Sequence, residues 1–357
     1  MEKKFILIGV GGFGGEFWCG RFIPQFAGYA RPVAAVDINP EAARRAAEVY
    51  GAVPPEKCYT DARRAIEENP CDFLAIVVPP DYRLPLIDLA VEFGLDVICE
   101  KPVADSMDHV CEIYRKMHDA GLKVVVTMSH RMERNKQSLQ SLIRGGAYGR
   151  LNYLIGRLTM RRSRAGQRHV PADPDEMMRR MLSEGVIHEL DTFRGMTGSN
   201  AKSVYAKVWK FDGGDAYGNS AFAQVEMENG VQCFVEHSHA NATELNGWGK
   251  EFYRAECAQG TLVLDRDELT AYNQLGHPQP ARAEVPLLDA GLRFEHPMLM
   301  HDFCQWLDGG PEPETSLRDN MQGCALTFAA LQSARTGRAV DVQAFLADYL
   351  TRYGITL

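Results

Sequence analysis

Closely spaced glycines near the N-terminus form a pattern that is typical of dinucleotide binding. The residues Gly9-Val10-Gly11-Gly12-Phe13-Gly14 make a G-x-G-x-x-G that follows an apolar run and precedes a segment of helical period. Glycines there let the backbone turn tightly and approach a pyrophosphate, and the helix that follows offers free N–H groups and a positive dipole end. We therefore expect the cofactor-binding residues to include Gly9, Gly11, Gly12, Phe13 and Gly14.

Asp37 ends the second apolar run, at the position where an acidic residue contacts the ribose of a dinucleotide. Its carboxylate can accept hydrogen bonds from the ribose hydroxyls and would repel a 2′-phosphate, which favours NAD over NADP as the cofactor. The alternative is that Asp37 only ends a strand and begins a turn.

Glu100-Lys101-Pro102 follows another apolar run, at the end of what we expect to be the fifth strand of a parallel sheet. Ligands of such sheets bind outside the carboxyl ends of the strands. A lysine beside a cationic nicotinamide could have a lowered pKa and exchange a proton with a substrate hydroxyl. The alternative is an ordinary surface lysine before a proline that forms a turn.

A third candidate cluster is the segment from Ser183 to Asp191. Glu184 and His188 are four residues apart and share one face if the segment is helical. A carboxylate beside an imidazole can fix its tautomer and raise its basicity, which suits a general base. The alternative is that His188 has only a structural role.

Two kinds of element must position these residues. In the first 128 residues, short apolar runs at 5–9, 33–37, 73–78, 97–99 and 123–127 alternate with segments of helical period. Apolar residues occupy both faces of such runs, as in strands covered by helices on both sides. Residues 1–128 are therefore predicted to form an NAD-binding Rossmann domain, a doubly wound parallel sheet.

Residues 129–357 differ, with longer alternating strands over 150–160 and 201–272 and helices over 295–307 and 319–336. Asn229-Gly230 between two alternating runs predicts a hairpin. We expect an α/β domain for substrate binding and oligomerisation, with a large, mostly antiparallel open sheet. Its half-apolar open face predicts a homodimer or homotetramer through this sheet.

The composition is ordinary for a globular protein. The 357 residues are 45% hydrophobic and 24% charged, with a net charge of −8. At roughly 150 residues per domain, this length predicts two domains. Disordered and collagen-like classes are excluded, and the acidic balance argues against nucleic-acid partners.

No apolar stretch approaches the roughly 18 residues of a membrane span, so we expect no membrane partner. The nine cysteines are scattered without a C-x-x-C, which indicates neither a zinc site nor a disulfide framework. This usage predicts a reducing, cytoplasmic location.

These motifs together resemble the glucose–fructose oxidoreductase / inositol dehydrogenase / MocA (Gfo/Idh/MocA) family over almost the whole chain. The matching segments are the glycine pattern, 77–80 before a helix, Glu100-Lys101-Pro102, His130-Arg131, 184–191 and the S-x-x-x-G-R-x-V of 333–340. The resemblance implies NAD(P)-dependent redox chemistry on a sugar or polyol by an oligomer. It also implies that Lys101 and His188 flank the substrate, that Lys101-Pro102 is a cis peptide, and that Pro79, Pro80 and Glu100 contact the cofactor and Arg131 the substrate.

Two positions depart from the family pattern. Glu184 stands where an aspartate is usual, so that the acid has shifted its geometry or left the site. Arg83 stands where many members have histidine, which would alter the cofactor pocket. Neither departure removes Lys101 or His188, and we expect an active enzyme.

Two further features concern the substrate. Arg161, Arg162, Arg164 and Arg168, with His169, crowd one loop, where they either hold an anionic substrate or form a solvated loop or subunit contact. We include Arg164 among the substrate-binding residues. His237-x-His239 places two imidazoles on one strand face near the substrate, but the further ligands that a metal needs are missing, so no metal is expected.

We therefore expect an NAD-dependent dehydrogenase that acts on a secondary hydroxyl or ketone of a sugar, glycoside or cyclitol, with Lys101, His188 and Glu184 as its catalytic residues. One alternative is a family member that uses tightly bound NAD for transient oxidation during glycoside cleavage. The other is a non-catalytic NAD-binding regulator.

Overall fold

The computed structural model describes residues 2–161, 173–213, 216–273 and 281–357. The chain divides into two compact units. The first consists of Met1–Ser129, Arg293–Met321 and Leu350–Leu357, and the second of His130–Leu292 and Gln322–Tyr349. Each unit is built on its own sheet.

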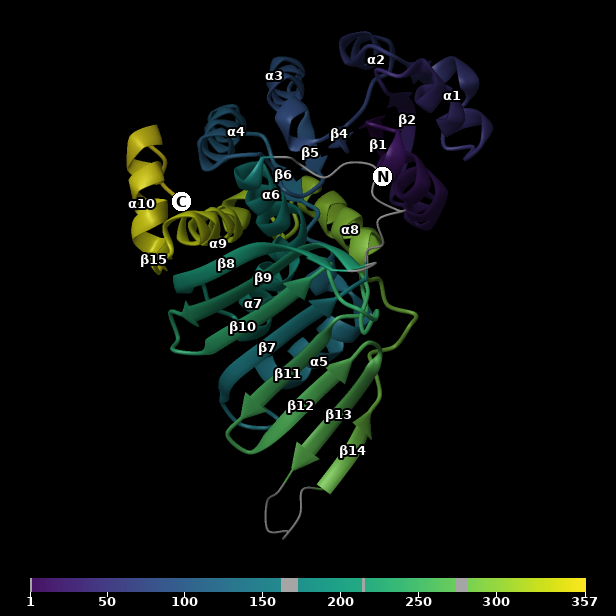
Figure 1. Ribbon diagram of the computed structural model, residues 1–357. Coiled ribbons are helices and arrows are strands. Elements are labelled where there is room, and N and C mark those ends of the chain that lie inside the picture. The colour runs from purple at the N-terminus through teal and green to yellow at the C-terminus, as the bar shows by residue number, and fades with distance from the viewer. Residues whose placement is uncertain (1, 162–172, 214–215, 274–280) are drawn as a thin grey trace. The chain divides into compact units, whose positions relative to one another are not determined.

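The first unit contains a six-stranded parallel sheet in the order β3-β2-β1-β4-β5-β6. Its strands other than β3 are labelled in Figure 1. Its strands are β1 (Lys3–Ile8), β2 (Ala30–Val36), β3 (Cys58–Tyr59), β4 (Phe73–Ile76), β5 (Asp96–Cys99) and β6 (Val124–Val126). All residues of β4 and β6 are buried, because both faces of the sheet are covered. The predicted doubly wound parallel sheet is confirmed, with the two-residue β3 as an edge strand that no apolar run indicated.

Local signals begin and end the helices that connect these strands. They are η1 (Gly14–Phe22), η2 (Ile23–Phe26), α1 (Pro40–Glu48), η3 (Pro55–Lys57), α2 (Ala62–Glu68), η4 (Pro80–Tyr82), α3 (Leu84–Phe93) and α4 (Met107–Asp119). The Asn39 side chain caps α1 by accepting a hydrogen bond from the N–H of Glu41 at 3.0 Å. Gly94 ends α3 in the left-handed conformation, at φ 65°.

The core of the first unit also contains residues from late in the chain. Helix α8 (Glu295–Leu307) contributes Met300 and Phe303, which are buried in one cluster with Phe5 and Phe73. The rings of Phe73 and Phe303 meet edge to face with centroids 5.1 Å apart. The assignment of cofactor binding to residues 1–128 and of substrate binding to residues 129–357 stays a prediction.

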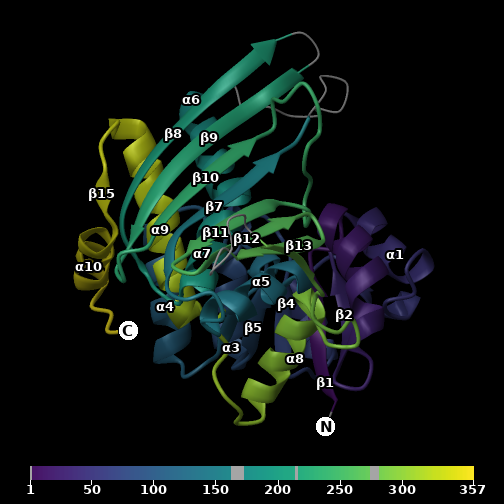
Figure 2. The same ribbon diagram turned by 90° about the horizontal axis from the view of Figure 1, so that it is seen from below.

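The second unit contains a nine-stranded sheet in the order β14-β13-β12-β11-β7-β10-β9-β8-β15, most of which can be followed in Figure 2. Its strands are β7 (Leu151–Thr159), β8 (Ala201–Gly213), β9 (Ala216–Met227), β10 (Gln232–Ser238), β11 (Phe252–Cys257), β12 (Gly260–Asp265), β13 (Glu268–Asn273), β14 (Ala281–Val285) and β15 (Val340–Asp341). β7 and β10 pair in parallel and the other neighbours are antiparallel, which confirms the expected fold. Asn229-Gly230 forms the predicted hairpin between β9 and β10, with Gly230 at φ 86°.

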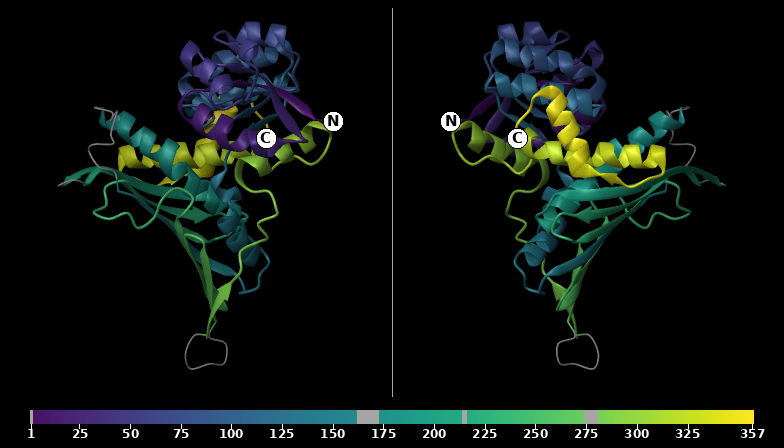
Figure 3. Two further views of the ribbon diagram at one scale, coloured as in Figure 1. Left: turned by 90° about the vertical axis from the view of Figure 1, so that its right-hand side faces the viewer. Right: turned by 90° about the vertical axis from the view of Figure 1, so that its left-hand side faces the viewer.

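Helices lie against one face of the second sheet, which Figure 3 shows from its edge. The helices of this part of the chain are η5 (His130–Met132), α5 (Arg134–Arg144), α6 (Pro174–Arg180), η7 (Met181–Val186), α7 (Ile187–Thr197), α9 (Leu317–Thr336) and α10 (Val342–Tyr353). α7 packs on β7, where Gly156 leaves room for Phe193 and Tyr253: a Cβ at Gly156 would lie 3.1 Å and 2.9 Å from their rings. A glycine in the middle of this strand therefore allows the helix to approach the sheet.

The opposite face of the second sheet carries large exposed side chains. Those that are exposed by more than a third are Tyr205, Trp209, Phe211, Phe222 and Phe234.

Within the described ranges, no helix is long and apolar enough to cross a membrane. All nine cysteines are free thiols in this structure.

Candidate functional site

The glycine pattern forms a turn in which backbone atoms approach too closely for side chains. Gly9 has φ 93°, and a Cβ there would lie 2.8 Å from the carbonyl carbon of Val77. A Cβ on Gly14 would lie 1.8 Å from the carbonyl oxygen of Gly9, whereas one on Gly12 would meet nothing within 4 Å. The turn therefore needs Gly9 and Gly14 for its own packing and leaves space beside Gly12 at the start of the helix, which suits a pyrophosphate.

Asp37 is held against this turn. Its Oδ2 accepts hydrogen bonds from the N–H groups of Val10 and Gly11 at 3.0 and 2.8 Å, and its Oδ1 accepts one from Asn39 at 2.9 Å. Ile38, the next residue, is 90% exposed, which is unusual for an isoleucine. The chemistry of these residues fits a dinucleotide, and the exposed Ile38 offers an apolar surface beside Asp37 that the sequence patterns did not single out. The sequence feature that could have identified Ile38 is its position directly after the acidic residue that ends a strand.

Glu100 lies inside the first unit. Its Oε1 is 2.8 Å from Nε2 of His296, and it accepts a hydrogen bond from Nε1 of Trp18 at 2.9 Å. Burial alone would raise the pKa of the Glu100 carboxyl, but His296 and Trp18 outweigh it and lower the pKa to about 2. Glu100 is therefore an ionised internal residue, and its expected contact with the cofactor stays a prediction.

Lys101 is half-buried and directly follows Glu100. The Lys101–Pro102 peptide bond is cis, which confirms what the family resemblance implied. The expected cofactor contacts Pro79 and Pro80 lie at the start of η4, after β4. Ligands of parallel sheets bind at the carboxyl ends of the strands. All the expected cofactor contacts described so far follow such ends in one sheet, namely the glycine turn, Asp37, Pro79, Pro80 and Lys101.

Arg83, the departure from the family pattern, joins two of these loops. It is 2% exposed, and its guanidinium donates to the carbonyl of Val78 at 2.9 and 3.0 Å and to the carbonyls of Glu100 and Pro102. Burial lowers the pKa of this guanidinium. Arg83 therefore acts as a clamp between the loop after β4 and the loop that carries Lys101.

In the second unit, His188 is the second residue of α7 and is 4% exposed. Its imidazole stacks on that of His130, with ring centroids 3.6 Å apart and planes at 14°. The Trp248 indole meets both imidazoles at steep angles, with centroids 5.8 Å from His188 and 5.5 Å from His130. Two aromatic side chains from distant parts of the sequence therefore fix the position of His188.

A buried ionic network lies behind His130. Nδ1 of His130 is 3.1 Å from Oε1 of Glu251, and Nζ of Lys136 contacts both Glu251 and Glu133, the latter at 2.5 Å. Burial opposes both charges, but Lys136 and His130 hold the pKa of Glu251 well below its usual range, and Glu251 and Glu133 raise the pKa of Lys136. Lys136 and Glu251 are each 1% exposed or less. Sequence reasoning missed this network because its partners are 115 positions apart.

Glu184 and Glu189 differ in environment. Glu184, the expected partner of His188, is exposed in η7, and its catalytic role stays a prediction. Glu189 is fully buried, and both its carboxylate oxygens lie 3.1 Å from Nδ1 of His237. Nε2 of His237 in turn lies 3.2 Å from Nε2 of His239. The pair His237-x-His239 is thus fixed by an acid next to His188 in sequence.

Arg131, expected to contact the substrate, is 4% exposed and pairs with Asp191 of α7 at 3.2 Å. This ion pair holds α7 one turn after His188, and a substrate contact of Arg131 stays a prediction. In the arginine-rich loop, Arg161 forms an isolated β-bridge with Ala240. Arg162, Arg164, Arg168 and His169 lie outside the described residues.

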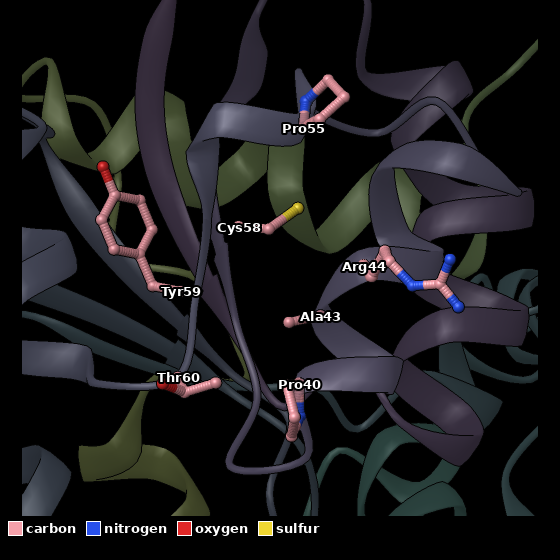
Figure 4. A pocket seen from close by; sticks show the side chains of 7 residues that line it. All are labelled: Pro40, Ala43, Arg44, Pro55, Cys58, Tyr59 and Thr60. Carbon is pink, nitrogen blue, oxygen red and sulfur yellow. The ribbon is translucent and has the colours of Figure 1, made fainter.

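Within the described residues, no group of three or more His, Cys, Asp or Glu side chains is arranged to hold a metal ion. A hollow of about 220 Å³ lies between α1 and β3, lined by Pro40, Ala43, Arg44, Pro55, Cys58, Tyr59 and Thr60 (Figure 4). It is smaller than the roughly 300–1,000 Å³ of most ligand sites. The hollow alone is therefore too small for a dinucleotide.

Comparison with known proteins matches two parts of the chain to models of one family. Residues 3–128 match the oxidoreductase family with an NAD-binding Rossmann fold, and residues 137–263 match the GFO/IDH/MocA C-terminal domain. The chain is 36% identical over 364 residues to the uncharacterized protein y4oX of Sinorhizobium fredii, with 98% of each chain covered. It is 26% identical over 328 residues to the D-apiose dehydrogenase of Paraburkholderia graminis, covering 89% of this chain and 85% of that protein.

A solved structure agrees with the fold. The oxidoreductase of Agrobacterium radiobacter in complex with NAD+, L-tartaric acid and magnesium superposes with a TM-score of 0.77 at 22% identity, covering 96% of this chain and 99% of that one. The resemblance drawn from the motifs is confirmed. The chain belongs to the Gfo/Idh/MocA family of NAD-binding oxidoreductases.

Proposed function

We propose that this protein is an NAD-dependent dehydrogenase that oxidises a secondary hydroxyl, or reduces the corresponding ketone, of a sugar, glycoside or cyclitol. The observation that carries the proposal is the buried His188 imidazole, which His130 and Trp248 hold in place. A relative named D-apiose dehydrogenase supports a sugar-like substrate.

The cofactor would bind at residues 1–128. The turn at Gly9, Gly11, Gly12, Phe13 and Gly14 would take the pyrophosphate, and Asp37 and Ile38 the adenosine, which favours NAD over NADP. NAD supplies the hydride transfer when bound. Residues 129–357 would bind the substrate.

His188 or Lys101 would accept the proton of the substrate hydroxyl. Lys101 would also stabilise the developing alkoxide with its positive charge. Glu184 would orient or polarise His188. Arg131 and Arg164 complete the proposed substrate contacts.

Two variants test these roles. Lys101→Ala and His188→Ala should each lower kcat by about 100-fold or more, since general acid–base groups contribute roughly 10²–10⁴. The affinity for NAD, measured by calorimetry, should change much less. Unaltered turnover in either variant would refute the role of that residue.

The substrate class is tested by following NADH formation with a panel that includes D-apiose, myo-inositol and glycosides. We expect NADH from at least one compound. Product formed from a glycoside without NADH, in protein that retains its cofactor through purification, would indicate transient oxidation. A panel without any reaction would refute the enzymatic proposal and favour a regulator.

The open face of the second sheet is proposed as the homo-oligomer interface, because its large aromatic side chains form a face typical of subunit contacts. Trp209 and Phe222 lie next to each other on it, with ring centroids 5.1 Å apart. Phe222→Glu should convert a dimer or tetramer to smaller species in light scattering. A wild-type monomer would refute this interface.

The nine free thiols fit the proposed cytoplasmic location.

A further inference from the structure

We propose that Glu251 is a positioning residue for the imidazole of His188, and that it acts through His130 and through the loop that carries Trp248. The proposal rests on the proposed function, because it concerns the residue that would move the substrate proton. Glu251 begins the chain segment that enters β11 and does not itself stack on His188.

One buried carboxylate contacts both His130 and the backbone next to Trp248, the two residues whose rings pack on His188. Oε1 of Glu251 lies 3.1 Å from Nδ1 of His130, whose ring is stacked on His188. The same oxygen accepts a hydrogen bond from the N–H of Gly249 at 3.1 Å, directly after Trp248. Loss of this carboxylate would therefore remove a contact of His130 and an anchor of the Trp248 loop at once.

The loop around Trp248 is anchored at several further points. The side chain of Asn246 donates to the carbonyl of Lys250 at 3.1 Å and accepts from the Thr159 hydroxyl at 3.1 Å. Nδ2 of Asn135 donates to the carbonyl of Gly249 at 3.0 Å. A loop held in this way presents its indole in one position, which is what an imidazole needs to transfer a proton repeatedly in one geometry.

The ionised carboxylate of Glu251 can bind Lys136 and position His130 at the same time, because each of its oxygens accepts hydrogen bonds. Lys136 contacts the second oxygen, Oε2, so Oε1 is left for His130 and Gly249. Together Lys136 and His130 keep the pKa of Glu251 below its usual range despite burial. An ionised carboxylate accepts hydrogen bonds at both oxygens, so it orients the Nδ1–H of His130 and the backbone N–H together.

The test compares Glu251→Gln with Asp267→Asn as a matched control. Asp267 is an exposed carboxylate in the turn between β12 and β13. It pairs with Lys250, which directly precedes Glu251. Glu251→Gln should lower kcat about ten-fold or more, since small misplacements of a reacting group have effects of this size. The dissociation constant for NAD should stay within about two-fold, and Asp267→Asn should match the wild type in both.

A readout that does not need activity is the imidazole NMR spectrum of the NAD-loaded protein. The His188 ring signals should shift in Glu251→Gln and not in Asp267→Asn. If no compound of the panel is oxidised but these signals shift, the proposed function fails and the positioning role survives. Unchanged His188 signals together with unchanged kcat would overturn the positioning role alone.

If Glu251→Gln does not fold, variants of His130 test the stacking on His188 through which Glu251 would act. His130→Phe keeps a ring on His188, whereas His130→Ala removes it. We expect kcat in His130→Phe to exceed that in His130→Ala by about ten-fold. Equal kcat values for the two variants would overturn the proposal.

Discussion

Replacing Glu100 with glutamine should remove a pH-dependent part of the stability of the first unit. The Glu100 carboxyl has an ordinary pKa of 4.5, which burial would raise but which His296, Trp18 and Thr127 lower to about 2. Because the folded pKa lies below the unfolded one, the stabilisation is fully present above about pH 4.5 and is lost as the pH falls toward 2. Glutamine keeps the size of the side chain and cannot ionise.

The magnitude follows from the shift of roughly 2.5 units at about 1.36 kcal/mol each, which gives roughly 3 kcal/mol for a fully buried group. The free energy of unfolding of Glu100→Gln should therefore be lower than that of the wild type by about this amount at pH 7. The difference should shrink to a small fraction of this amount near pH 2, where about half of the wild-type carboxyl is protonated.

Urea unfolding at several pH values between 7 and 2 measures this difference. Tryptophan fluorescence is a suitable signal, since the buried Trp18 donates its hydrogen bond to Glu100 itself. Asp308→Asn is the control, because Asp308 is an exposed carboxylate that pairs with Lys3 in the same unit. A difference between Glu100→Gln and the wild type that does not vary with pH would refute the reasoning.

Three further changes have defined outcomes. Gly156→Ala should lower the free energy of unfolding by about 1–3 kcal/mol in urea titrations, because its Cβ would lie 2.9 Å from the buried Tyr253 ring; a variant as stable as the wild type would contradict this close approach. Lys136→Met should cost about 3–5 kcal/mol in the same assay, since it leaves Glu251 as a buried charge without its ammonium partner; Lys136→Met/Glu251→Gln should recover part of the loss. Asp37→Ser should reduce the ratio of kcat/KM for NAD to that for NADP by about ten-fold or more, because the repulsion of a 2′-phosphate is lost; an unchanged ratio would separate Asp37 from cofactor choice.

The elements of the fold were predictable because their signals are local. Apolar runs, the glycine turn and Asn229-Gly230 each involve neighbouring residues, and both sheets follow from them. The edge strand β3 was not predictable, because two residues carry no periodic pattern. The place of α8 was not predictable either, since its apolar face does not indicate which unit it joins.

The candidate site was predictable only as separate motifs. The positions of Asp37, Lys101 and His188 follow from spacing and from the family resemblance. The stacking of His130 on His188 and the contacts of Glu251 are side-chain geometry between residues that are far apart in sequence. The sequence showed Arg83 as a departure from the family pattern. Its hydrogen bonds to carbonyl groups of two loops could not be predicted, because folding brings those carbonyls together.

The shared core of the first unit has a consequence for biosynthesis. Phe303 packs on Phe73, so the hydrophobic layer around β4 stays incomplete while the ribosome makes the intervening chain. At roughly 5–20 residues per second, Phe303 follows Ser129 by on the order of 10–35 s. During this interval the nascent first unit lacks part of its apolar core, and residues 130–292 of the second unit are synthesised before Phe303 can complete it.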